Sequence, residues 1–295
     1  MARMTRPSST SRATSAVGGH VRVSGGLAKG GLACADAIGA EAVQVFVTNP
    51  RGWALTLGDP RQDAAFRDGC AERGIAAFVH APYLVNLGSP TAATVEQSAA
   101  SVRHTLVRAR EIGARGVVVH TGSAVLGGAR EAALRQVRQR LMPLLDAIPD
   151  DGPDLLLEPT AGQGMSLCAT VDDLGPYLEA LDHHPRVGVC LDTCHAFAAG
   201  HDLAAPHGMK QTLDRLVRVA GKGRLKLVHA NDSMDVVGAH RDRHEKIGKG
   251  HIGEEPFARM FAHPALRGVP VVIETPGDQA DYARDIALLK DLRDR

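Results

Sequence analysis

The chain has few aromatic side chains: one Trp, three Tyr and six Phe among 295 residues. Since 44% of the residues are hydrophobic, its core must be mainly aliphatic. No apolar run approaches the roughly 20 residues that a helix needs to cross a bilayer, so we expect no membrane-spanning segment. The five cysteines form no CxxC pair, and the sequence contains no signal-peptide pattern. These absences favour free thiols in a reducing cytoplasm.

The chain also lacks a charge excess of either sign, with 34 Lys and Arg against 33 Asp and Glu. A net charge of +1 gives no general attraction to polyanions, so any nucleic-acid contact must depend on a local basic face. No GxGxxG motif follows the first predicted strand, and the segment SGGLAKGG lacks the spacing of a phosphate-binding P-loop. These patterns argue against a dinucleotide-binding protein and a P-loop NTPase.

An alternation of β-rich runs with helical patterns begins at about residue 20. The runs are 20–24, 42–47, 76–82, 116–122, 154–160, 187–193, 225–232 and 269–276. Eight strands, each followed by room for a helix, predict a (β/α)8 TIM barrel, with a doubly wound open sheet as the alternative. We expect one catalytic domain over 19–295. Residues 1–18 are rich in Ser, Thr and Arg without an acid and predict a disordered tail.

Six consecutive predicted strands, the third to the eighth, carry His, Asp or Glu where they end. These residues are His80, His120, Glu158, Asp192 (with His195 just beyond), His229 and Glu274. Side chains at the C-terminal ends of barrel strands converge on one axis. Any single one could be a polar group at the rim. Six of them crowded together carry a desolvation and repulsion cost that only cations readily offset, so the pattern predicts a polynuclear metal centre.

The loop after the seventh predicted strand adds Asp242 and His244, two residues apart, which point the same way on an extended segment. Carboxylates and imidazoles are ligands that zinc accepts, and these candidates exceed the needs of one tetrahedral ion. They suit two or three ions that share a bridging carboxylate, an arrangement typical of phosphoester hydrolysis. The residues alone therefore predict a multimetal barrel hydrolase. A metal-dependent sugar isomerase, which shares the barrel and an acid-and-histidine rim, remains an alternative.

Six long motifs go further than these patterns. They are HAPYLVNLGSP (80–90), VVVHTGS (117–123), LLLEPTAGQG (155–164), GVCLDTCHAFAAGHDL (188–203), LVHANDS (227–233) and DRHEKIGKGHIG (242–253). In these motifs the chain resembles the endonuclease IV family, the zinc-dependent apurinic/apyrimidinic endonucleases of base-excision repair. The resemblance covers nearly the whole chain after the tail, for which it offers no counterpart.

The resemblance implies a barrel that holds three zinc ions. The first ion would be held by His80, His120 and Glu158. Glu158 would bridge to a second ion and orient the attacking hydroxide. The other ligands of the second ion would be Asp192, His229 and Glu274, and the third ion would take His195, Asp242 and His244. Asn231 and Asp232 are expected around the ligands rather than among them.

The implied reaction is hydrolysis of the phosphodiester 5′ to an abasic site in duplex DNA. It leaves a 3′-hydroxyl and a 5′-deoxyribose phosphate, and trimming of blocked 3′ ends is the expected second activity. We expect the protein to act as a monomer. A protein that binds abasic DNA without cleaving it, and uses zinc only for structure, is the non-enzymatic alternative.

The resemblance also implies DNA contacts in loops at the same face. Tyr83 and Leu84 are expected to enter the helix at the lesion, because a ring and an aliphatic wedge fill the space that an extruded nucleotide leaves. Arg51 and Arg243 are expected to contact the DNA backbone or groove. Pro159 stands where many relatives have Asn, which puts a hydrogen bond around the bridging Glu in doubt.

Overall fold

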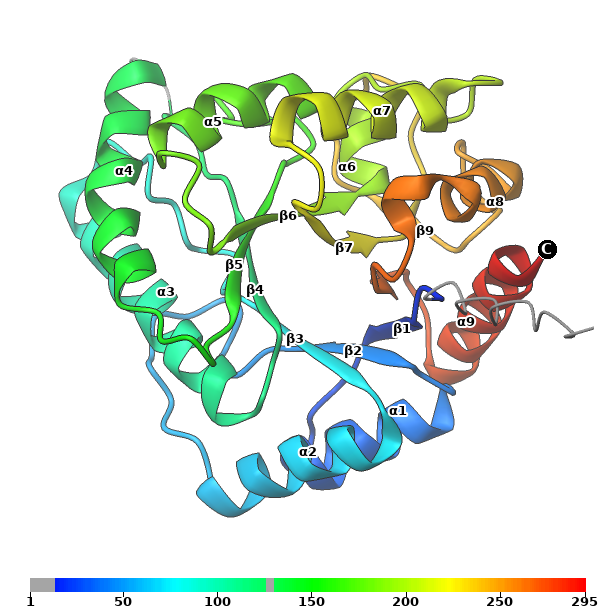
Figure 1. The fold of residues 1–295 in the computed structure, drawn as a ribbon, viewed down its shortest axis with the longest axis horizontal. Helices are drawn as coiled ribbons and strands as arrows, with labels where there is room; N and C mark the ends of the chain where they lie inside the picture. Colours follow the sequence, from blue (N-terminus) through cyan, green and yellow to red (C-terminus); the bar gives the residue numbers. More distant parts are fainter. Residues whose placement is uncertain (1–13, 126–129) are drawn as a thin grey trace, which may run out of the picture.

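Residues 14–125 and 130–295, the part of the chain that the computed structural model describes, form a closed barrel of parallel strands (Figure 1). Around the barrel the strand order is β1-β10-β7-β6-β5-β4-β3-β2. The strands are β1 (Val17–His20), β2 (Ala42–Val45), β3 (Ala76–His80), β4 (Gly116–His120), β5 (Asp154–Glu158), β6 (Val187–Asp192), β7 (Leu225–His229) and β10 (Val271–Ile273). The predicted (β/α)8 barrel is therefore confirmed, and the doubly wound alternative is wrong.

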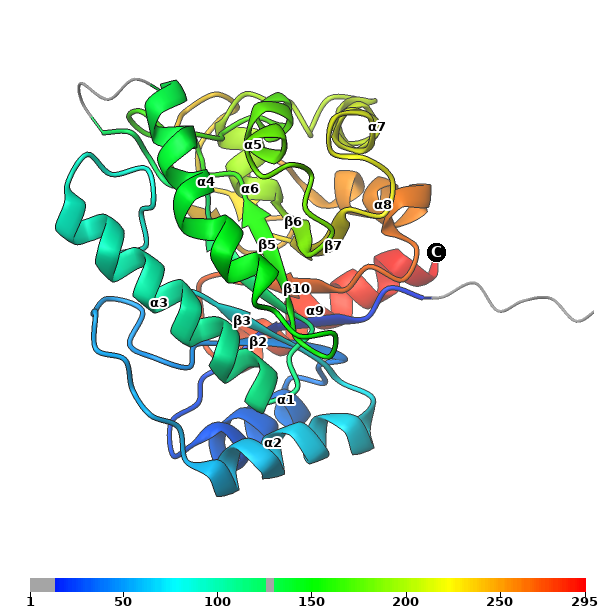
Figure 2. The ribbon, with the colours of Figure 1, turned by 60° about the vertical axis from the view of Figure 1, so that its left-hand side comes forward.

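Helices form an outer ring around the strands (Figures 1 and 2). They are α1 (Ala33–Ala37), α2 (Pro60–Arg73), α3 (Ala92–Glu111), α4 (Arg130–Asp146), α5 (Leu174–Ala180), α6 (Thr193–Ala198), α7 (Gly208–Ala220), α8 (Glu254–Ala262) and α9 (Gln279–Asp294). A π-helix, Leu27–Leu32, leads into α1, and short 3-10 turns, Val171–Asp173 and Pro264–Leu266, precede α5 and β10. Among the described residues, none of these helices is both long and apolar enough to span a membrane.

The first strand lies earlier than the sequence predicts, over Val17–His20 instead of 20–24. Its sequence VGGH has few β-favouring side chains, but Gly18 is buried where a Cβ atom would come 1.6 Å from the Ala42 carbonyl oxygen. Only glycine permits this approach between β1 and β2. Val17 and Gly18 thus belong to the barrel although they fall within the predicted tail, whose residues 1–13 lie outside the described residues.

Two apolar layers hold the barrel together. A small cluster made of inward-facing strand residues fills the interior, including Phe78, Leu156 and Cys190, while a larger layer lies between strands and helices. As expected from the low aromatic content, both layers are mainly aliphatic. Because the interior is packed, polar chemistry is confined to the end where the strands run out.

A short antiparallel pair, β8 (Asp232–Ser233) with β9 (His244–Glu245), lies beyond β7. It holds the long loop after β7 back toward the barrel mouth, because Ser233 pairs with His244. Asp232 strengthens this fold-back. Its buried carboxylate accepts hydrogen bonds from the backbone N–H groups of Gly248, Gly250 and Ile252.

Candidate metal centre

The polar strand ends meet at the C-terminal mouth of the barrel. His80, His120, Glu158, Asp192 and His229 are the last residues of five adjacent strands, β3 to β7. His120 is in register with Glu158, and Asp192 with His229, so these ends lie side by side. Glu274 directly follows β10.

Glu158 lies at the centre of this group and is completely buried. Its Oε2 lies 3.2 Å from His80 Nε2 and 3.3 Å from His120 Nε2. Its Oε1 lies 2.9 Å from His229 Nδ1. One carboxylate oxygen therefore faces each of two histidine groups, which is the geometry that a bridging ligand requires.

A second group forms around His229. Its Nδ1 lies 3.2 Å from Glu274 Oε2 and 3.8 Å from Asp192 Oδ2. One ligand atom from each of Glu158, Asp192, His229 and Glu274 lies within 4.8 Å of the others. Three carboxylates around one imidazole are a donor set that suits a divalent cation.

A third group joins α6 to the loop after β7. Asp242 Oδ2 lies 3.2 Å from His195 Nε2, and its Oδ1 lies 3.0 Å from His244 Nε2. The Nε2 atoms of His195 and His244 are buried, and among the described residues their contacts to Asp242 lack the alignment of a hydrogen bond. A buried nitrogen left without a partner is costly. A metal ion bound at these two nitrogens fits this environment.

Backbone carbonyls orient three of the imidazole rings. His80 Nδ1 lies 2.6 Å from the Ala81 oxygen, His195 Nδ1 3.1 Å from the Pro159 oxygen, and His244 Nδ1 3.2 Å from the Glu274 oxygen. Because a carbonyl only accepts, each Nδ1 carries a proton, so the lone pair of the neutral ring is on Nε2 and faces the site. Pro159 thus contributes to the site through its backbone carbonyl.

Charge in the site is balanced between imidazoles and carboxylates. Burial works to raise the pKa of Glu158, but His229 and His120 outweigh it and hold that pKa well below its usual value. Burial likewise opposes the charge of His244, yet Asp192 and Asp242 raise its pKa to about 9. Without metal, protonated histidines therefore neutralise the carboxylates. A bound cation would displace those protons.

Hydrogen bonds from residues just beyond β6 and β7 organise the carboxylates. Asn231 donates from Nδ2 to Asp192 Oδ2 over 2.7 Å and accepts at Oδ1 from the Glu274 N–H over 2.8 Å. The Asp192 Oδ1 atom accepts from the His195 N–H at the start of α6. Asn231 thus bonds two candidate ligands without being one itself, as expected, whereas Asp232 accepts hydrogen bonds from the loop after β7.

The predicted DNA-contact residues lie at the same face. Tyr83 is 47% exposed, and its ring packs edge-on against Phe46 and His80 at centroid distances of 5.3 and 5.4 Å. Leu84 beside it is 38% exposed, although both are large and apolar. The Tyr83 ring thus lies against the candidate ligands His80 and His120, and Leu84 follows it as an exposed apolar residue.

The two predicted basic contacts lie in exposed loops. Arg51 follows β2, and no ion pair holds its side chain among the described residues. Arg243, between Asp242 and His244, lies 3.6 Å from Asp235 through Nε. Both side chains are exposed, Arg243 between two candidate ligands, and Arg51 is unpaired in the described part of the chain.

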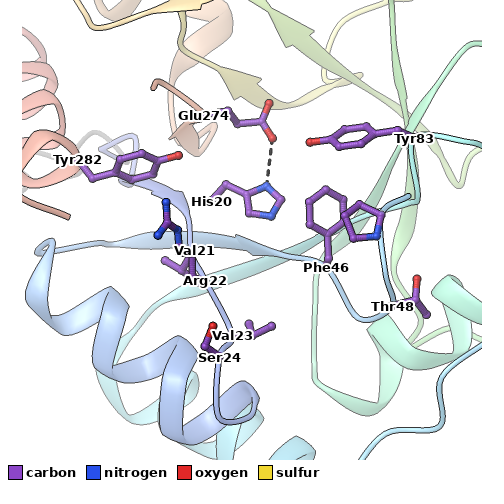
Figure 3. A pocket seen from close by; sticks show the side chains of 11 residues that line it. His20, Val21, Arg22, Val23, Ser24, Phe46, Thr48, Tyr83, Glu274 and Tyr282 are labelled. Atoms are coloured by element: carbon purple, nitrogen blue, oxygen red, sulfur yellow. Dashed lines mark hydrogen bonds and ion pairs between the residues drawn. The ribbon is translucent and has the colours of Figure 1, made fainter. Parts of the chain in front are cut away.

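A pocket of about 570 Å³ opens beside the metal-ligand candidates, and Glu274 and Tyr83 line both this pocket and the metal site. Figure 3 shows Tyr83 and Tyr282 on opposite sides of Glu274, with His20 between Glu274 and Phe46. Arg22 lies near Tyr282 and gives the Tyr282 side of the pocket a positive charge. Arg22 and Tyr282 are not predicted from the sequence, because neither lies in one of the six motifs.

His20 and Gln44 are two further site residues that are not among the predicted ones. His20 Nδ1 lies 3.1 Å from Glu274 Oε1, and Gln44 contacts both His20 and Glu274. His20 ends β1 in the same way that His80 ends β3, so correct placement of the first strand would have found it. The signal for Gln44 is a polar residue inside the buried run AVQV.

Comparison with known proteins identifies the family. The model for "Xylose isomerase-like TIM barrel" proteins matches residues 32–292. A protein of Streptomyces avermitilis named "Probable endonuclease 4" is 65% identical over 279 residues, which are 94% of this chain and 90% of that protein. The chain belongs to the endonuclease IV family. A family member from Streptomyces coelicolor is 62% identical over 98% of this chain and 99% of its own length, so the expectation that the tail has no counterpart is wrong.

Solved structures agree with this assignment. Endonuclease IV from Thermus thermophilus superposes with a TM-score of 0.82 and 33% identity, over 95% of this chain and 99% of that one. A D-tagatose 3-epimerase-like protein has a TM-score of 0.67 and 20% identity over 86% of this chain and 89% of that one, which shows only a shared fold. The chain is thus an endonuclease of this family, and the isomerase alternative has no support beyond the fold.

Proposed function

We propose that this endonuclease hydrolyses the phosphodiester 5′ to abasic sites in duplex DNA, and that it also trims blocked 3′ ends. The observation that carries the proposal is Glu158, a fully buried carboxylate with one oxygen toward His80 and His120 and the other toward His229. This bridging arrangement suits metal ions held close together, which serve phosphoester hydrolysis.

The donor set fits three zinc ions. His80, His120 and Glu158 would hold the first, Glu158, Asp192, His229 and Glu274 the second, and His195, Asp242 and His244 the third. When bound, the ions lower the pKa of water and neutralise charge on the phosphate. Imidazole and carboxylate donors support zinc more than magnesium, which prefers oxygen ligands alone.

The chain's own residues bind and orient the substrate. Tyr83 and Leu84 are exposed at the mouth and would occupy the space of the extruded nucleotide, while Arg51 and Arg243 would bind backbone phosphates. The thiols of Cys190 and Cys194 are not nucleophiles. Burial raises the pKa of Cys190 to about 12 and the pKa of Cys194 as well, so both keep their protons. We also infer that the enzyme is a cytoplasmic monomer, whose mass in solution would be 31.1 kDa.

The first experiment measures zinc and cleavage together. Protein stripped with a chelator and restored with zinc is expected to hold about three ions per chain and to nick a duplex with one tetrahydrofuran abasic analogue, without added magnesium. The undamaged duplex is the control. If zinc-restored protein left the abasic duplex intact, the proposed activity would be lost. Tight binding of that duplex without cleavage would instead favour the non-enzymatic alternative.

Tyr83→Ala is expected to weaken binding to the abasic duplex by about 5- to 150-fold, because one base-stacking ring contributes about 1–3 kcal/mol. Zinc content should not change, since the Tyr83 ring packs against His80 but Tyr83 is not a candidate ligand. Fluorescence anisotropy and elemental analysis check both statements. Tyr83→Phe should retain binding, and Val107→Ala, at an exposed apolar position on α3, should have no effect. A fall in zinc content would contradict this separation of roles.

A further inference from the structure

Gln44 is a completely buried amide on β2 at the mouth of the barrel. Its Nε2 donates to Glu274 Oε1 over 2.7 Å, and its Oε1 lies 2.9 Å from His229 Nε2. Its Nε2 also lies 3.0 Å from His20 Nδ1. The side chain therefore touches two of the candidate ligands of the second ion from behind.

The chemistry of these partners determines how the amide and the imidazole are oriented. An ionised carboxylate only accepts, so the NH₂ group of Gln44 must face Glu274 and its carbonyl oxygen must face His229. A carbonyl oxygen accepts as well, so His229 carries its proton on Nε2. In the neutral ring the lone pair of His229 is then on Nδ1, the atom that faces Glu158 Oε1 at 2.9 Å and Glu274 Oε2 at 3.2 Å.

His229 differs in this respect from the other histidines of the site. Backbone carbonyls orient His80, His195 and His244 through Nδ1, which leaves Nε2 for the site. His229 presents the opposite nitrogen, and its other nitrogen bonds the Gln44 side chain. The tautomer of His229 is thus set by a replaceable side chain.

We propose that Gln44 is the positioning residue of the second metal site: it fixes His229 as an Nδ1 ligand and holds Glu274 with Oε2 toward the metal. The inference rests on the proposed metal centre and adds a residue that the ligand set does not contain. Both effects come from one amide, so its loss disturbs two ligands at once.

A merely structural role explains Gln44 less well. Its inward-facing neighbours on the strands, such as Ala42 and Phe78, are apolar and fill the barrel interior. An amide buried at such a position is costly unless its hydrogen bonds are made. Within the described chain, the side-chain partners of Gln44 are His20, His229 and Glu274, and all three line the site. The hydrogen bonds that make burial of this amide tolerable are therefore those to residues of the metal centre.

The first test is Gln44→Met, which conserves volume and removes the hydrogen bonds to Glu274 and His229 together with the contact to His20. We expect zinc at one of the three sites to bind about 10- to 100-fold more weakly, the usual loss when a group that orients a ligand is removed. Competition with a graded series of chelators measures it. Gln136→Met is the matched control, because the Gln136 amide also makes two hydrogen bonds, to the Leu87 and Ser89 carbonyls, away from the site. Equal zinc affinity in the two variants would overturn the proposal.

The second test needs no variant at Gln44. Nitrogen-15 NMR of the zinc-loaded wild-type protein, with His229 assigned by the signals that disappear in His229→Asn, should show a proton on Nε2 and zinc on Nδ1. Zinc on Nε2 would overturn the proposal even if Gln44→Met failed to fold. If the wild-type protein bound no zinc and left abasic DNA intact, the proposed function would fail instead, so the two failures are distinguishable.

Discussion

Glu158→Gln is expected to reduce the rate of abasic-site incision by a factor on the order of 10²–10³, about the loss seen when one preorganised electrostatic group is removed from an active site. The carboxamide is isosteric with the carboxylate but lacks its charge. It can offer one oxygen but not two, so one of the contacts to His120 and His229 would become an NH₂ group facing an imidazole lone pair. Bridging between two ions would then be lost, and zinc content should fall below three per chain.

The measurement is single-turnover nicking at saturating zinc, with zinc content determined on the same sample. The fold should remain, because the substitution conserves volume in a site that the barrel strands already surround. Glu255→Gln is the control, since Glu255 lies exposed on α8 and pairs with Arg259 on the same helix. Wild-type turnover in the Glu158→Gln protein would refute its bridging role. Loss of far-UV circular dichroism would assign the defect to folding.

The barrel could be predicted because its strands and helices have distinct local patterns. Seven strands lie where the sequence predicts them, since runs such as GVVVH and DLLLE are dense in β-favouring or apolar residues. The first strand lies elsewhere because its local composition is poor. Gly18 lies so close to the Ala42 backbone that no side chain would fit, and this contact exists only once β1 and β2 are side by side. Tertiary packing, which no local pattern contains, decides its position.

The site residues likewise divide into those that local sequence patterns predict and those that depend on tertiary packing. The strand ends converge in any barrel, so His80, His120 and Glu158 could be expected at one mouth from order alone, and the structure brings them together. Only the resemblance to the family implied that these three form one group. The long loop that carries Asp242 and His244 had to fold back across the mouth, which the family motifs implied and β8–β9 pairing accomplishes. The sequence marks Gln44 only as a polar residue inside a buried run, and its contacts to His229 and Glu274 could not be predicted because they lie on strands far from β2 in sequence.

Removal of zinc is expected to destabilise the protein, and increasingly so as the pH rises from about 6.5 to 9. Without metal, protonated imidazoles neutralise the carboxylates around His229 and His244. Burial lowers the pKa of His244, but Asp192 and Asp242 outweigh it and raise that pKa to about 9. A folded pKa above the unfolded value of 6.5 contributes stability that is fully present below pH 6.5 and lost as the pH passes 9. For His244 alone that is about 3 kcal/mol, on the scale of 1.36 kcal/mol per pKa unit.

Zinc removes this dependence of stability on pH, because it binds the neutral imidazole and replaces the proton as the neutralising charge. The zinc-loaded protein should therefore lose little stability over the same interval. The difference in Tm between zinc-loaded and chelated protein should widen from pH 6.5 to pH 9, and calorimetric titration should detect protons released on zinc binding. The His184–Asp146 pair, in which the aspartate is largely exposed, provides a comparison. His184→Asn should leave the widening unchanged, whereas His244→Asn should reduce it. A Tm difference that did not vary with pH would mean that protons and zinc do not compete for these histidines.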